Sequence, residues 1–295
     1  MRNGITCLSF CLLLMLLVSP ASGGQQPQEN PPVTVQNMKG NIYQVKGGSG
    51  ANTGFFVGDK EVVVIDAKMT EESARQMLSE IKKVTPNPVA KVILTHSDGD
   101  HVNGLVGFPV GIDIISHENT RVHMDAAFQS DQQRMHLPGI TFSEKMSLFL
   151  SAGGKSKRID LLYFGPAHTN GDVIVCFPEE KIAFIGDLLF LGRDPLIHRA
   201  KNGSSFGLVK VLDSLLNLDV ETYLSGHNEP STKQQIRELK ASIEEKQARI
   251  QAMVKDGKSL EKVKKAFNIA ATPGDSRWPS LVEVIYQELT EKKSH

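Results

Sequence analysis

Short apolar runs that end in polar residues recur along the chain and define its predicted architecture. Residues 62–65 and 92–94 are apolar throughout, which is typical of strands buried inside a sheet. Between them, apolar residues at helical spacing over 70–84 predict an amphipathic helix capped by Thr70. Three earlier segments of β-type composition are expected to pair with the first run as a meander: 33–35, 41–45 and 55–57.

The second half of the chain repeats this alternation of strands and loops. We expect a helix over 207–216 and strands over 158–164, 172–177, 181–185 and 222–224. From residue 231 onward, apolar residues at helical spacing predict a long amphipathic helix and two shorter ones. These residues, 231–295, are expected to form a helical extension packed on the main domain. A homodimer through these helices is the alternative, favoured by the seven-residue spacing of Ile236, Ile243 and Ile250.

The N-terminus has the pattern of an export signal. Arg2 precedes a leucine-rich run over 5–18, and small residues follow at 21–23, which is typical of a cleaved secretory signal peptide. We therefore expect a signal peptide over 1–23, a linker over 24–32, and a periplasmic or secreted protein with no stable membrane insertion after cleavage. A retained membrane anchor is the alternative, although the run is short for a membrane span.

The composition is that of an ordinary soluble protein. Lys and Arg number 33, as do Asp and Glu, and 40% of the 295 residues are hydrophobic. This balance produces no overall field that would attract nucleic acid, so the expected partner is a small-molecule substrate. Signal cleavage would leave Cys176 as the only cysteine, which excludes an intramolecular disulfide. Its apolar surroundings predict a buried strand residue.

The densest group of candidate metal ligands follows the apolar run over 92–94. His96, Asp98, Asp100 and His101 fall within six residues. Imidazole nitrogens and carboxylate oxygens are the ligands that borderline divalent metals accept. A polar surface turn would explain the aspartates, but it would not explain two histidines in one short loop.

The spacing His96-x-Asp98-x-Asp100-His101 resembles the first metal motif of the metallo-β-lactamase-fold hydrolases, His-x-His-x-Asp-His. An aspartate, Asp98, stands where the family has its second histidine. The later family motifs also occur in order, at residues 165–172, 184–190 and 223–227. The resemblance covers roughly residues 33–230. It implies an α/β fold, an αββα four-layer sandwich of the metallo-β-lactamase type, with the C-terminal helical extension added to it.

The resemblance also implies a pair of metal sites. One would be held by His96, Asp98 and His168 and the other by Asp100, His101 and His227, with Asp187 bridging them. Two zinc ions would then hold a hydroxide that attacks the substrate, and Asp100 is assigned to this catalytic machinery. Because Asp98 makes the first site richer in oxygen, iron, manganese or a single filled site are alternatives.

The type of substrate is less closely defined. Many lactam-hydrolysing relatives have cysteine in place of Asp187 and lysine in place of Phe190. The pattern therefore favours a hydrolase of esters, thioesters, lactones or amides, similar to glyoxalase II and the lactonases. Export favours a β-lactamase-like antibiotic hydrolase as the alternative. A third interpretation is an iron-containing redox relative, or a metal-binding protein with little turnover. Candidate cations for an anionic substrate are Arg193, His198 and Lys201, for which a solvated loop is the competing interpretation.

Some polar residues outside these motifs keep a structural interpretation. Asp66, at the end of the strand over 62–65, either braces the metal loop, as in the family, or is a simple turn residue. Three further histidines lack metal-site spacing and are expected to be solvated or to cap helices: His117, His123 and His136.

Overall fold

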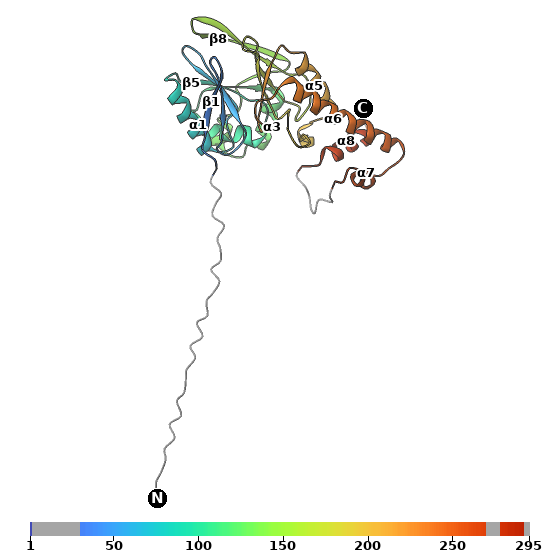
Figure 1. Cartoon of the computed structure of the whole chain (residues 1–295). Coiled ribbons are helices and arrows are strands. Elements are labelled where there is room, and N and C mark those ends of the chain that lie inside the picture. The colour runs from blue at the N-terminus through green and yellow to red at the C-terminus, as the bar shows by residue number, and fades with distance from the viewer. Residues whose placement is uncertain (2–29, 270–277, 292–295) are drawn as a thin grey trace.

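The computed structural model of the chain describes Met1, residues 30–269 and residues 278–291 (Figure 1). The predicted signal peptide, apart from Met1, and most of the predicted linker lie outside the described residues. Export therefore stays a prediction.

The first sheet combines a meander with parallel strands. Its strands follow one another in sequence order: β1 (Thr34–Lys39), β2 (Ile42–Lys46), β3 (Thr53–Val57), β4 (Val62–Ile65), β5 (Val89–Ile93), β6 (Asp113–His117) and β7 (Ile140–Phe142). Strands β1 to β4 pair antiparallel, as the predicted meander requires, whereas β4 to β7 pair parallel. The parallel half places the end of β5, and the ligand loop after it, in the interior of the sheet.

The second sheet has the order β12-β11-β10-β9-β8. Its strands are β8 (Lys145–Ala152), β9 (Lys155–Leu162), β10 (Ile174–Phe177), β11 (Ile182–Gly186) and β12 (Thr222–Ser225). Strands β7 and β8 were not predicted, and β9 begins three residues before the predicted strand over 158–164. Gly153 and Gly154, with φ of +60° and +70°, close the hairpin between β8 and β9. This two-residue glycine turn is the hairpin signal that was overlooked.

The helices lie in two outer layers. They are α1 (Glu71–Val84), α2 (Gly99–Val102), α3 (Glu118–Ala127), α4 (Asp131–Arg134), α5 (Ser205–Asn217), α6 (Lys233–Lys255), α7 (Leu260–Ala266) and α8 (Leu281–Thr290), with 3₁₀ turns at Asn103–Gly107 and Arg199–Lys201. Figure 1 shows α1 on the side of the molecule opposite α5, α6 and α8. The predicted cap is confirmed, since the Thr70 side chain accepts a hydrogen bond from the Ser73 amide.

Alternation along the strands explains the four layers. In β4, Val63 packs between the two sheets with Phe177, whereas Val62 and Val64 face the other way, against Met77 of α1. A third cluster joins the outer face of the second sheet to α5, α6 and α8. The αββα sandwich with a C-terminal helical extension is therefore confirmed.

The extension uses its apolar residues within the chain. Ile236, Ile243 and Ile250 of α6 are buried in the cluster that also contains residues of α5 and α8. The seven-residue spacing that favoured a homodimer is thus accounted for by internal packing, and the dimer stays a prediction. Cys176 is buried in β10 as expected. In the part of the chain that the structure describes, no helix has both the length and the apolar character needed to cross a bilayer.

Candidate metal centre

The ends of strands from both sheets deliver the candidate ligands to one place. His96 follows β5 in the first sheet, while Asp187 and His227 follow β11 and β12 in the second. Gly226 allows the close approach, because a Cβ there would lie 2.5 Å from Oδ1 of Asp187 and 2.7 Å from Cε1 of His101. A strand end is a rigid support, so the positions of these side chains are set by the two sheets.

Part of the ligand loop is helical. The helix α2 begins at Gly99, and the 3₁₀ turn over Asn103–Gly107 follows it. Asp100 and His101 are therefore helical residues, and the amide of His101 donates to the carbonyl of Asp98, 2.9 Å away. This turn directs both side chains toward the second sheet.

The first group of candidate ligands is buried. The ligand atoms of His96, Asp98 and His168 lie within 4.8 Å of one another. Oδ2 of Asp98 lies 3.0 Å from Nε2 of His168 and 3.9 Å from Nε2 of His96. The spacing fits atoms that would share one ion.

The second group contains the remaining four candidates. Ligand atoms of Asp100, His101, Asp187 and His227 also lie within 4.8 Å of one another. Nε2 of His227 is 3.1 Å from Oδ2 of both Asp100 and Asp187, and Nε2 of His101 is 3.1 Å from Oδ1 of Asp187. The rings of His96 and His101 are 4.1 Å apart, centroid to centroid, so the two groups adjoin. The structure thus brings together all seven residues that the resemblance implied.

The outward ring nitrogens are held by hydrogen bonds, which leaves the inward ones for an ion. Nδ1 of His168 donates to the carbonyl of Leu196 at 2.8 Å. Nδ1 of His96 lies 3.1 Å from Oγ1 of Thr95, whose single hydroxyl proton is already donated to Asp66. Nε2 of His96 therefore carries a lone pair, and it is buried without a hydrogen-bond partner. These donor atoms fit a divalent metal ion.

Asp66 braces the ligand loop. Oδ1 accepts a hydrogen bond from the Thr95 amide at 2.8 Å, and Oδ2 lies 2.7 Å from both Oγ1 of Thr95 and Nδ1 of His101. The simple-turn interpretation of Asp66 is therefore wrong. The sequence indicated this role only through the resemblance, because Asp66 and His101 are 35 positions apart.

The carboxylates control the charge of the neighbouring histidines. Burial by itself lowers the pKa of His168 and His227, but their hydrogen bonds to Asp98, Asp100 and Asp187 raise both pKa values to about 9. Burial raises the pKa of Asp187, yet His101 and His227 outweigh this and hold it well below its usual range. Without an ion, these carboxylates stay ionised and hold protons on histidines. The same negative charge favours a divalent cation.

A cleft of about 600 Å³ opens beside the two groups. Asp98, Asp100, His198 and Lys201 form part of its polar lining, and apolar side chains line the rest: Met69, Met124, Phe128 and Trp278. Nδ1 of His198 lies 3.0 Å from Oδ1 of Asp98. A substrate with polar and apolar parts could reach the candidate ligands here.

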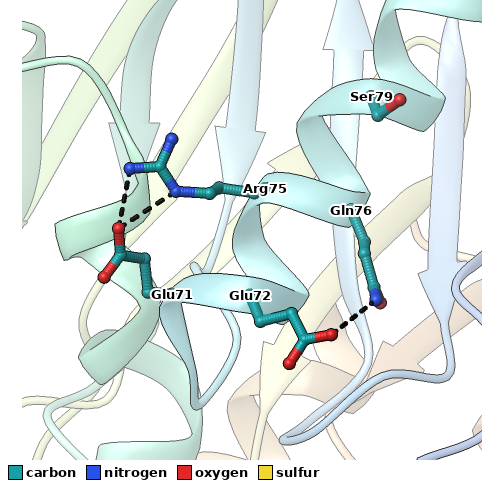
Figure 2. A pocket seen from close by; sticks show the side chains of 5 residues that line it. All are labelled: Glu71, Glu72, Arg75, Gln76 and Ser79. Atoms are coloured by element: carbon teal, nitrogen blue, oxygen red, sulfur yellow. Dashed lines mark hydrogen bonds and ion pairs between the residues drawn. The ribbon is translucent and has the colours of Figure 1, made fainter.

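Arg193 lies outside the cleft, one aromatic ring away from His227. Its guanidinium sits over the ring of Phe190, 4.4 Å from the centroid, and Phe190 in turn stacks on His227 with centroids 5.6 Å apart. Arg193 is not among the residues that line the cleft. A separate hollow lies on the surface of α1, where Arg75 pairs with Glu71 and Gln76 with Glu72 (Figure 2). It contains none of the candidate ligands.

The structure also places the three remaining histidines. His123 is half-buried, with Nε2 2.7 Å from Oδ1 of Asn170, so it neither caps a helix nor is fully solvated. His117 is buried and caps α3, accepting from the amide of Asn119, so the capping interpretation holds. His136 is buried and bonds to backbone carbonyls of Gln132 and Phe108, so it is not solvated. Sequence reasoning did not identify Trp278, whose ring lies 4.4 Å from that of His198. No local pattern marks it, because it enters the site from the C-terminal extension.

Comparison with known proteins agrees with the fold. The family model of the Metallo-beta-lactamase superfamily matches residues 47–227, and the chain belongs to that superfamily. It is 28% identical over 199 residues to the 2,4-dinitroanisole O-demethylase subunit alpha of Nocardioides sp., which covers 67% of this chain and 58% of that protein. It is 30% identical over 173 residues to the metallo-beta-lactamase type 2 of Elizabethkingia meningoseptica, covering 56% and 66%. The chain thus spans less than two thirds of the length of either relative.

Solved structures show the same fold at lower identity. A metallo-beta-lactamase from Pontibacter korlensis matches with a TM-score of 0.60 and 17% identity, covering 72% of this chain and 99% of that one. The DIM-1 metallo-beta-lactamase matches with a TM-score of 0.61 and 16% identity, covering 73% and 99%. At these identities the likeness concerns the fold alone.

Proposed function

We propose that the protein is an exported metal-dependent hydrolase that holds two zinc ions in the adjoining groups described above. The observation that carries this proposal is the convergence of seven histidine and aspartate side chains, from both sheets, at the edge of the cleft. Divalent ions bound at such a pair of sites lower the pKa of water toward neutrality and polarise the bond to be cleaved.

The chain's own residues have distinct parts in this proposal. His96, Asp98 and His168 would hold one ion and Asp100, His101 and His227 the other, with Asp187 between them. Asp66 and Thr95 keep two of the histidine rings oriented, so the donor atoms are in place before substrate binds. Cleft residues would position the substrate.

An ester, thioester, lactone or amide is the substrate class we favour. Phe190 stacks on His227 at the position where many lactam-hydrolysing relatives have a lysine for the substrate carboxylate. The second candidate is a β-lactamase-like antibiotic hydrolase, which the 30% identity to the Elizabethkingia meningoseptica enzyme favours.

Metal quantification combined with a substrate panel tests the proposal. The panel contains p-nitrophenyl esters, a thioester, a lactone and a chromogenic cephalosporin. We expect zinc to co-purify, and we expect hydrolysis of an ester, thioester or lactone to be lost with a chelator and restored by zinc. His101→Ala should abolish turnover, whereas His123→Ala, outside both groups, should not. Cephalosporin turnover alone would favour the second candidate, and hydrolysis that survives in His101→Ala would refute the proposed site.

A further inference from the structure

The segment from Leu196 to Lys201 supports two of the three residues in the first group. Leu196 accepts a hydrogen bond from Nδ1 of His168 at 2.8 Å through its carbonyl. The amide of His198 donates to the carbonyl of His168 at 2.7 Å. The same segment carries His198 and Lys201, the two side chains that contact Oδ1 of Asp98, so one loop shapes most of this group.

The two oxygens of Asp98 have different partners. Oδ1 accepts hydrogen bonds from Nζ of Lys201 at 2.7 Å and from Nδ1 of His198 at 3.0 Å. Oδ2 faces the other way, 3.0 Å from Nε2 of His168 and 3.9 Å from Nε2 of His96. Asp98 is 7% exposed, so this division is made inside the protein. One oxygen is anchored, and the other lies among the candidate ligand atoms.

We propose that Lys201, assisted by His198, is a positioning residue that holds Asp98 as a one-oxygen ligand of the first ion site. The inference rests on the proposed metal site. It explains how an aspartate serves at the position where the family has a histidine. A histidine would present one neutral nitrogen, whereas a free carboxylate presents two oxygens and a negative charge. Lys201 occupies the extra oxygen and balances that charge.

Lys201 is itself held in place. Its Nζ also donates to the carbonyl of Ser97 at 2.9 Å, and its backbone carbonyl accepts from the amide of Asn170 at 3.0 Å. The lysine therefore links the ligand loop of the first sheet to the His168 loop. Without it, Oδ1 of Asp98 would lose its charged partner in a buried setting, which favours rotation of the carboxylate toward the cleft.

The chain contains its own reporter for this site. Trp278 is the only tryptophan, and its ring lies 6.3 Å from His168 and 4.4 Å from His198, centroid to centroid. Its emission should change when zinc binds to the first group. Metal binding can therefore be followed without measuring activity.

The first experiment titrates zinc into the metal-free full-length chain. Trp278 emission gives the affinity of the first site, and elemental analysis gives the number of ions bound. Loss of a side chain that orients a ligand typically lowers metal affinity about tenfold to hundredfold, so we expect this loss in Lys201→Met. Lys210→Met, on the exposed face of α5, should stay within a factor of about two of wild type.

The second experiment asks whether Lys201 acts through Asp98. In Asp98→His the carboxylate is gone, so adding Lys201→Met should change the zinc affinity by no more than a factor of about two. If Lys201→Met lowers the zinc affinity equally in the Asp98→His background, the role of Lys201 is structural and the inference is overturned. The inference is also overturned if Lys201→Met alone binds zinc with the affinity of the wild type. Wild-type protein that binds no ion at the first site would overturn both this inference and the proposed function. If the wild type binds two ions and Lys201→Met has the same zinc affinity as the wild type, only this inference is overturned.

Discussion

Oδ2 of Asp66 and Nδ1 of His101 are 2.7 Å apart, and this contact joins the end of β4 to α2. Both residues are buried, at 2% and 0% exposed. The contact fixes which nitrogen of His101 faces Asp187. A residue that is not a candidate ligand thereby determines the geometry of the second group.

Replacing Asp66 should therefore weaken metal binding. Asparagine is the suitable substitution because Asp66 has a φ of +61°, which asparagine tolerates. Asp66→Asn removes the charge that orients His101, so we expect zinc affinity to fall about tenfold to hundredfold. Competition with a zinc chelator would measure it. Asp219→Asn, on the surface, is the matched control; equal affinities in the two variants would contradict a bracing role.

Gly226 provides a steric test of the second group. An added Cβ would lie 2.5 Å from Oδ1 of Asp187, closer than real Cβ atoms approach. Gly226→Ala should displace Asp187 or His101 and reduce the zinc stoichiometry, while the fold is kept. Gly139→Ala is the control because a Cβ there has nothing within 4 Å. Elemental analysis and circular dichroism compare them, and full zinc content in Gly226→Ala would argue against the second site.

The pH dependence of stability should differ between metal-free and zinc-loaded protein. Without metal, the pKa of both His168 and His227 is about 9, above the usual 6.5. The protonated forms therefore stabilise the folded state fully below pH 6.5, and this stabilisation is lost as the pH rises to about 9. Zinc requires the unprotonated rings, so the loaded protein should not show that loss.

Urea unfolding at several pH values between 6.5 and 9 measures this effect. The free energy of unfolding should fall across this range for metal-free protein and hold or rise for the zinc-loaded form. Parallel curves for the two forms would show that zinc does not replace protons on these histidines.

Export can be tested at the N-terminus. Arg2, the leucine-rich run and the small residues at 21–23 predict cleavage close to Gly23. Sequencing of the protein from its native host should give a first residue between about 22 and 27. A soluble cytoplasmic form that retains Met1 would contradict the prediction.

The sequence by itself determined most of the strands and, through its resemblance to the metallo-β-lactamase family, the fold class and the seven candidate ligands. Apolar runs marked most strands, and histidine and aspartate residues just beyond them marked the loops. Both signals are local, because a buried strand and the residues that follow it occupy a continuous stretch of chain. The sequence failed where the local signal was weak, as in β8, where Ser147 and Ser151 interrupt the apolar residues and Phe149 is exposed.

Only the tertiary structure decided how the ligands are held. Lys201 and Asp98 are 103 positions apart, and Trp278 enters the cleft from the C-terminal extension. The seven-residue spacing in α6 was consistent with internal packing and with a dimer, and only the structure shows the helix packed against α5 and α8. Contacts between distant residues depend on how the two sheets pack, which no single stretch of sequence encodes.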